Sequence, residues 1–234
     1  MKALGEEHYD KLSSKKRINE YIAGSNLRVE EAVHILRPGR RLLDVGCNDG
    51  TLGALVQDRF EEIYGIDISE KAVKLSQQKG IKAYKINLNI EGLPFEDSYF
   101  DSITCLSTLQ GIYDLIFTLG ELSRVMRQHG ELILTVPNMR TYWRIFKLAV
   151  LGDFPRTSLD LAGYDGGTLH YFCYRNIRKL LEKSGFEVNL HKGIYIHPRI
   201  LENLPESGLI GKLKAEFMSA EMFVRSLKIR SNIE

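Results

Sequence analysis

Carboxylates and glycines around one short apolar stretch are the residues of this 234-residue chain best suited to holding a ligand. Residues 41–45 (RLLDV) are typical of a buried parallel strand, with Asp44 at its carboxyl end. Gly46 and Gly50 then allow a tight turn and let the backbone approach a ligand closely. Because ligands of open α/β sheets bind at the carboxyl edge of the strands, Arg41–Gly53 predicts a ligand-binding turn.

The residues missing from this turn indicate the kind of ligand. A dinucleotide fingerprint, G-x-G-x-x-G, needs glycines where Asn48 and Thr51 stand, and no Gly-Lys-Ser/Thr for a phosphate loop follows Gly50. Asp44 and Asp49 would also repel an anion. S-adenosylmethionine (SAM) carries a sulfonium and an ammonium against one carboxylate, so acidic groups suit it on Coulombic grounds.

A third carboxylate, Asp67, supports an adenosine ligand. Residues 61–66 (EEIYGI) predict the next strand, and Asp67 ends it about twenty residues after the glycine turn, where a carboxylate can accept both ribose hydroxyls. The alternative is that Asp67 caps the helix opening at Ser69, although Ser69 can itself be that cap. Both roles are compatible.

Composition limits the class of protein. The length suits one domain with a sizeable core, and a formal charge of +2 argues against a nucleic-acid partner. No apolar run approaches the roughly twenty residues of a membrane span, and the N-terminus lacks the apolar core of a signal peptide. We therefore expect a soluble cytoplasmic protein with no membrane partner.

The cysteines do not indicate a metal site. Cys47, Cys105 and Cys173 are odd in number, far apart and without metal-ligand spacing, so we expect reduced packing residues and no metal. Cys47 lies within the ligand-binding turn and is expected to contact a ligand through its backbone. Nucleophilic chemistry there would need a base for which the sequence gives no sign.

Strands and helices alternate after the turn, which is typical of a doubly wound α/β sheet with helices on both faces. The expected strands are 41–45, 61–66, 81–86, 102–106, 131–136, 186–196 and 222–228. The expected helices are 51–60, 69–79, 113–127 (closed by Gly130), 143–151 (amphipathic), 175–184 and 210–218. Residues 152–168, with Gly166 and Gly167, predict a mobile excursion above the sheet edge.

We expect one domain, 1–234, with four parts: a helical N-terminal lid (1–37), a ligand-binding core (38–136), a substrate or lid insertion (137–175) and C-terminal helices and strands (176–234). Tyr9 and Arg17 are the lid residues expected to reach the cofactor. The basic run 15–17 is interpreted as a solvated helix face rather than a nucleic-acid site.

The motifs DVGCNDG, GIDIS and INLNIEGLPFEDSYFDSI resemble, in order and spacing, those of class I SAM-dependent methyltransferases. The later LSTLQGI, LTVPNMRTYWRIFKL and TLHYF are similar to the methionine-biosynthesis protein W family, in the type 11 methyltransferase group. The resemblance covers roughly residues 38–190. It implies a seven-stranded, mostly parallel sheet of order 3-2-1-4-5-7-6 with the last strand antiparallel.

The resemblance also implies roles in binding SAM or its product, S-adenosylhomocysteine. The methionine part would meet Gly46 with its neighbours Asp44, Cys47, Asn48 and Gly50, the ribose Asp67, the adenine faces Ile68 and Leu88, and the open side Leu106 or Ser107. One departure is Asn87, which stands where the family usually has an acid. An amide oxygen can still accept from the adenine amino group, but without charge, so we expect weaker adenine binding.

The leading hypothesis is an enzyme that transfers a methyl group from SAM to a small-molecule acceptor by in-line displacement. Alignment alone can supply much of such a barrier, so a base is not obligatory. If one is needed, His170 is the candidate, with Gln110 and Tyr113 placed to orient the acceptor. The alternatives are that His170 anchors the lid and that Tyr113 packs the following helix.

A second hypothesis is a protein that binds SAM or its product and acts as partner or regulator of another enzyme. The resemblance implies an acyltransferase of methionine synthesis as such a partner. Nucleic-acid methylation is disfavoured by the near-neutral charge and by the lack of an Asn-Pro-Pro-Tyr motif, to which 136–138 (VPN) is only superficially similar.

Overall fold

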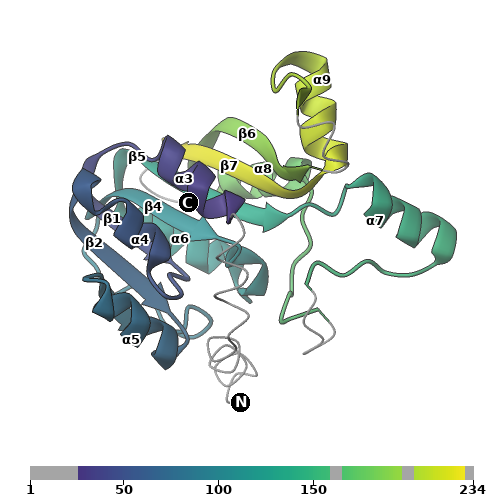
Figure 1. Ribbon diagram of the computed structural model, residues 1–234. Helices are drawn as coiled ribbons and strands as arrows, with labels where there is room; N and C mark the ends of the chain where they lie inside the picture. The colour runs from purple at the N-terminus through teal and green to yellow at the C-terminus, as the bar shows by residue number, and fades with distance from the viewer. Residues whose placement is uncertain (1–25, 159–164, 197–202, 230–234) are drawn as a thin grey trace.

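The computed structural model describes residues 26–158, 165–196 and 203–229, which form a seven-stranded sheet flanked by helices (Figure 1). Its strands are β1 (Gly39–Val45), β2 (Phe60–Asp67), β3 (Lys82–Lys85), β4 (Phe100–Leu106), β5 (Met126–Pro137), β6 (Phe186–Ile196) and β7 (Ser219–Lys228). The order β3-β2-β1-β4-β5-β7-β6 confirms the expected topology. Strand β7 runs antiparallel to both its neighbours, β5 and β6, and the other pairs are parallel.

Helices pack on both faces of the sheet (Figure 1). They are α3 (Leu27–Ile35), α4 (Thr51–Leu55), α5 (Glu70–Gln78), α6 (Leu115–Val125), α7 (Tyr142–Phe146), α8 (Tyr174–Lys183) and α9 (Gly208–Leu213). Short helical turns are η1 (Gln57–Arg59), η2 (Leu109–Gly111), η3 (Lys147–Leu151) and η5 (Lys214–Met218). None of these described helices is long and apolar enough to cross a membrane.

The alternation of side chains along β1 shows that this strand is buried on both faces of the sheet. Leu43 and Val45 pack in the core that contains residues of α6 and α8, whereas Leu42 packs in the core that contains residues of α3 to α5. Leu42 and Leu43 are fully buried, and burial of each such side chain contributes roughly 1.5–3 kcal/mol. This double-sided burial fixes the position of Asp44 and of the turn that follows it.

The helix predicted over 51–60 is shorter than expected. Helix α4 ends at Leu55, the turn η1 follows, and Phe60 already belongs to β2. Phe60 is buried and pairs with Gly39 at the start of the β1–β2 ladder. Pairing with a strand distant in sequence therefore decides the conformation at this boundary, which helical periodicity cannot show.

The prediction that Gly130 closes the helix expected over 113–127 is wrong. Helix α6 ends at Val125, and β5 begins at Met126 with a register shift before Glu131. Gly130 lies inside this irregular part of the strand, where a Cβ would come within 2.9 Å of the carbonyl oxygens of Arg127 and Asp101. The glycine is needed for close backbone approach in a β-bulge, not for a helix end.

Two expected lid segments fall partly outside the described residues. Tyr9 and Arg17 lie outside them, and so does the tip residue Tyr164. Asp165, the next residue, is buried and accepts hydrogen bonds from the backbone N–H groups of Thr157 and Ser158 at 2.7–2.8 Å. The two ends of the 152–168 excursion are thus joined by hydrogen bonds within the described residues.

Candidate functional site

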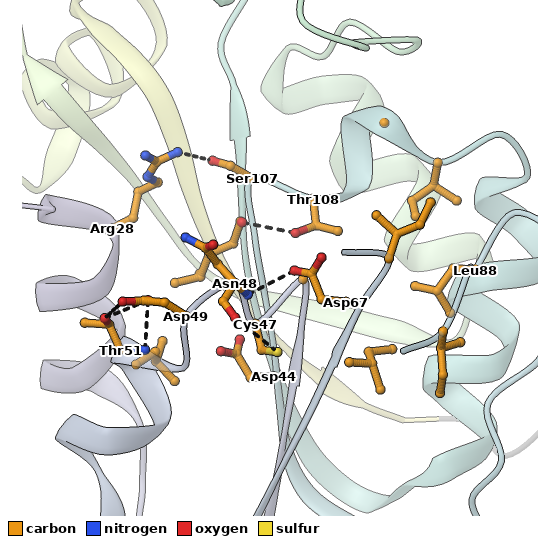
Figure 2. Close-up of a pocket in the computed structure, with 18 of the residues that line it drawn as sticks. Arg28, Asp44, Cys47, Asn48, Asp49, Thr51, Asp67, Leu88, Ser107 and Thr108 are labelled. Carbon is orange, nitrogen blue, oxygen red and sulfur yellow. Dashed lines mark hydrogen bonds between the residues drawn. The ribbon is translucent and has the colours of Figure 1, made fainter. Parts of the chain in front are cut away.

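A cavity of about 410 Å³ opens at the carboxyl ends of β1, β2 and β4, in the size range of small-molecule sites (Figure 2). Ten predicted cofactor residues line it: Asp44, Gly46, Cys47, Asn48, Asp67, Ile68, Asn87, Leu88, Leu106 and Ser107. Gly50 does not line it, although its neighbours Asp49 and Thr51 do. Leu88 lies at the opposite end of the cavity from Arg28, with Asn48 and Asp67 between them (Figure 2).

Protein contacts alone already require glycine at both positions of the turn, Gly46 and Gly50. Both have a φ of +74°, a conformation that side chains disfavour. A Cβ on Gly46 would lie 2.1 Å from Thr108 Oγ1, and one on Gly50 would lie 2.6 Å from Ser76 Oγ. The glycines therefore let the turn pack against the chain after β4 and against α5.

Asp67 fixes the loop opposite the glycine turn. Its Oδ2 accepts from the backbone N–H of Asn48 at 3.0 Å, and its Oδ1 accepts from the N–H of Ser69 at 2.9 Å. Ser69 itself is the N-cap of α5, because its Oγ accepts from the N–H of Ala72. Asp67 is thus not the helix cap, and its carboxylate joins the ends of β1 and β2 at the wall of the cavity.

The pKa values of Asp44, at the end of β1, and Asp49, in the turn, are shifted in opposite directions. Asp44 is only 5% exposed, and burial, reinforced by the nearby charges of Asp67 and Asp49, raises its pKa to about 6 despite a 2.7 Å hydrogen bond from Thr104. Burial also opposes ionisation of Asp49, but hydrogen bonds from Lys79 and Thr51 outweigh it and lower its pKa. The charge of Asp49 is therefore paired with Lys79, whereas Asp44 is a buried acid of the cavity wall that accepts a hydrogen bond from Thr104.

The Cys47 thiol is unsuited to nucleophilic chemistry. Burial, followed by the charges of Asp44 and Asp67, raises its pKa far above the ordinary value. The Sγ atom donates to the carbonyl of Asn48 at 3.8 Å. Since the thiolate is the reactive form, this cysteine behaves as the packing residue that its sequence context predicts.

Asn87 lines the cavity beside Leu88, and its side-chain oxygen already accepts one hydrogen bond. Its Oδ1 accepts from the backbone N–H of Asn89 at 3.1 Å, which keeps the side chain in place. An amide oxygen has two lone pairs, so one acceptor position remains for the predicted adenine contact.

Arg28 of α3 is a site residue that the sequence did not indicate, and among the described lining residues it is the only cation. Its Nη1 donates to Ser107 Oγ at 2.6 Å and to Glu221 Oε1 at 3.2 Å. Burial raises the pKa of Glu221 although Arg28 opposes the shift. These partners are 79 and 193 positions away along the chain, so no local pattern could have identified the group.

The three residues proposed for catalysis lie together but beside the cavity. The backbone N–H groups of Leu169 and His170 donate to the carbonyl of Gln110 at 2.8 and 3.0 Å, and His170 Nε2 lies 3.3 Å from the carbonyl of Tyr113. Gln110 Nε2 donates to the carbonyl of Ser107, whereas its buried Oε1 has no hydrogen-bond partner among the described residues. These contacts anchor the segment around His170 on the turn η2, and its role as a base stays a prediction.

Solved structures share the fold. A possible histamine N-methyltransferase from Thermotoga maritima matches with a TM-score of 0.62 and 20% identity, over 90% of this chain and 95% of that one. A Haloferax volcanii protein proposed to be a methyltransferase, in complex with the Trm112 methyltransferase activator, matches with a TM-score of 0.70 and 13% identity, over 95% and 98%. The [4+2]-cyclase SpnF matches with a TM-score of 0.61 and 19% identity, over 86% and 80%.

Relatives are similar over parts of the chain. An uncharacterized protein of Methanocaldococcus jannaschii is 29% identical over 70% of this chain, which spans 62% of that protein. A ubiquinone biosynthesis O-methyltransferase of Alkalilimnicola ehrlichii is 31% identical over 49% of this chain and 47% of its own length. A bifunctional methionine biosynthesis protein MetXA/MetW of Rhodopirellula baltica is 29% identical over 48% of this chain and 19% of its own length.

The family itself is decided by a profile that covers most of the chain. The profile of the methionine biosynthesis protein MetW matches residues 28–206, from Arg28 in the cavity wall to Glu206 before α9. This range contains the ligand-binding turn, the strand-end acid Asp67 and the insertion after β5. The chain therefore belongs to the MetW family and has the fold of SAM-dependent methyltransferases.

Proposed function

We propose that the protein binds SAM in the 410 Å³ cavity and transfers its methyl group to a small-molecule acceptor. The observation that carries the proposal is Asp67, whose carboxylate is held at the end of β2 opposite the glycine turn of β1. Such a strand-end acid can accept the ribose hydroxyls. The adenine would then lie toward Ile68, Asn87 and Leu88, and the methionine part toward Gly46.

Charge matching supports SAM over other adenosine ligands. The lining offers the carboxyl groups of Asp44, Asp49 and Asp67 and the guanidinium of Arg28. SAM presents two cationic groups and one carboxylate, so each ligand charge has an opposite partner. We assign the methionine carboxylate to Arg28, because Arg28 lies at the end of the cavity away from Leu88 (Figure 2).

The chemistry follows from alignment. The acceptor's nucleophilic atom forms a bond to the methyl carbon while the bond from that carbon to sulfur breaks, and neutral S-adenosylhomocysteine leaves. The acceptor loses its proton to water or to a side chain. Holding the reactants at near-attack distance can supply roughly 7–11 kcal/mol of the barrier, so the described residues need not include a strong base.

Calorimetric titration with SAM and with S-adenosylhomocysteine tests the binding part. We expect both to bind wild-type protein, and Asp67→Ala to weaken both by roughly tenfold or more. A screen of small molecules for methylated product then tests the transfer. Failure of both ligands to bind would contradict the whole proposal, whereas binding without product from any acceptor would favour the second candidate.

The second candidate is a SAM-binding partner or regulator of another enzyme. One finding favours it: the MetXA/MetW relative joins a MetW segment to another protein in one chain. A fold can host several functions, so the cavity does not decide between them. Stable co-elution with the acyltransferase of methionine synthesis, together with a change in that enzyme's rate on adding SAM, would support this role.

A further inference from the structure

Helix α7 and the turn η3 form a rod whose surface is unusual. We call residues Tyr142–Leu151 the arm, and Figure 1 shows it projecting away from the sheet. Leu148, Val150 and Leu151 are 52%, 65% and 61% exposed, and Ile145 and Phe146 are also exposed. Large apolar side chains gathered on one projecting segment mark a surface that becomes covered.

The charges around the arm indicate what covers it. Residues 139–156 contain four cations (Arg140, Arg144, Lys147, Arg156) and one acid (Asp153) in a chain of net charge +2. Arg144 is buried, whereas Lys147 and Arg156 are exposed. Lys147 lies within the apolar stretch, is exposed, and has no acid within ion-pair distance among the described residues. A long lysine side chain can keep its ammonium in water or at a phosphate while its stem lies along hydrocarbon.

A basic groove continues this positive surface from the base of the arm. The groove, between α8 and α9, has a volume of about 630 Å³ and includes Arg140. Arg140 and Arg178 are paired with Glu216 and Glu182, respectively. Arg175, Lys179 and Lys212 also line the groove and have no ion pair among the described residues.

We propose that the arm attaches the protein to the surface of an anionic lipid membrane. A rod of ten residues is about 15 Å long, too short to span the roughly 30 Å hydrocarbon layer but long enough to enter the interface. Tyr142 and Trp143 stand at the base, where aromatic side chains favour the headgroup level, and the aliphatic residues stand toward the tip. Asp153 just beyond the tip limits the insertion to the interface.

This inference concerns surface attachment and agrees with the absence of a spanning helix among the described residues. It is independent of the proposed methyl transfer, because the arm residues do not line the cofactor cavity. Apolar contact with acyl chains and attraction of the cations to acidic headgroups act together in such binding. Neither contribution requires a conformational change in the sheet.

Vesicle co-sedimentation tests the proposal with the full chain. Vesicles of phosphatidylcholine alone are compared with vesicles of phosphatidylcholine and phosphatidylglycerol in equal parts. We expect binding to the mixed vesicles that weakens with salt, a loss of about tenfold for Leu148→Ser combined with Leu151→Ser, and a similar loss for Lys147→Glu. Ile116→Ser on α6, at 49% exposure, and Lys71→Glu on α5 are matched controls expected to bind like wild type.

Far-UV circular dichroism and thermal unfolding monitor the state of the fold, which every variant is expected to keep. No binding of wild-type protein to mixed vesicles would overturn the proposal. Equal losses in the arm variants and in their controls would also overturn it. If the arm variants instead change the molar mass measured by light scattering, the arm is an interface between copies of the chain and the lipid proposal is wrong.

Discussion

In folded proteins acids are usually exposed and leucines buried, and the cofactor cavity and the arm reverse this pattern in different ways. At the cavity the chain buries acids, with Asp44 only 5% exposed, whereas on the arm it exposes leucines by more than half. Charged residues are rarely buried unless paired, and large exposed apolar patches are uncommon on monomers. Neither arrangement stabilises the isolated fold, and the two support the proposed SAM site and the proposed membrane-binding surface, respectively.

The two regions also differ in how tightly they are built. In the cavity wall, Asp67 joins two backbone N–H groups, and Gly46 contacts Thr108 too closely to admit a side chain. At the tip of the arm, Gly152 has a positive φ as well, but a Cβ there would meet nothing within 4 Å. The conformation of the cavity wall therefore depends on close packing. The fold of the arm does not, so substitutions there should cost little stability.

The largest loss of stability is expected from Gly46→Ala, and Gly152→Ala is its comparison. Gly46→Ala combines a strained φ with a clash against Thr108, and should lower the free energy of unfolding by roughly 2–5 kcal/mol and abolish SAM binding. Gly152→Ala meets only the backbone strain, about 1–2 kcal/mol. Urea unfolding measures both. Equal losses for the two variants would mean that backbone conformation, and not packing, governs the turn.

The second largest effect is expected from Asp67→Ala, which should reduce the affinity for SAM. Asp67→Ala should weaken SAM binding by about 1.5–3 kcal/mol per lost charged hydrogen bond. Because Asp67 also accepts from the backbone N–H groups of Asn48 and Ser69, the variant should in addition be less stable than wild type. Calorimetry well below the unfolding temperature separates the two effects, and wild-type affinity in a folded variant would limit Asp67 to holding the loop.

A smaller effect is expected from pH. Burial raises the pKa of Asp44 to about 6 from 3.8, so between pH 7 and about pH 5 the group gains a proton and SAM affinity should fall by about tenfold. The raised pKa also means that the unliganded protein loses stability as the pH rises from about 4 to about 6, since the folded state holds this proton more firmly. Titrations across this range, with Asp44→Asn as the control, measure the dependence. A wild-type profile identical to that of Asp44→Asn would assign it to another group.

The smallest effect on stability is expected on the arm. Leu151→Ala should change the free energy of unfolding by less than about 0.5 kcal/mol, because the side chain is 61% exposed. Leu43→Ala, at a fully buried position of β1, should cost roughly 2–5 kcal/mol. Thermal or urea unfolding of the pair checks the contrast. A large loss at Leu151 would show that the arm packs against the protein in solution.

The sequence determined the features that depend on local pattern. Alternating apolar runs predicted all seven strands, and the resemblance implied their order. Ten of the predicted cofactor residues line one cavity, because the carboxyl ends of neighbouring parallel strands meet at one edge of a sheet. A strand and the turn after it are consecutive residues, so the local sequence suffices to place Asp44 near the end of β1 and Asp67 at the end of β2.

Only the tertiary structure decided which distant residues meet. Arg28 reaches the cavity through Ser107 and Glu221, and Gly46 is required by Thr108, none of which follows from spacing along the chain. Residues 143–151 look amphipathic in sequence, yet in the structure their apolar side chains are largely exposed. Periodicity shows which side chains share a helix face, but burial depends on whether another element packs against that face. In the described structure no other element covers the arm.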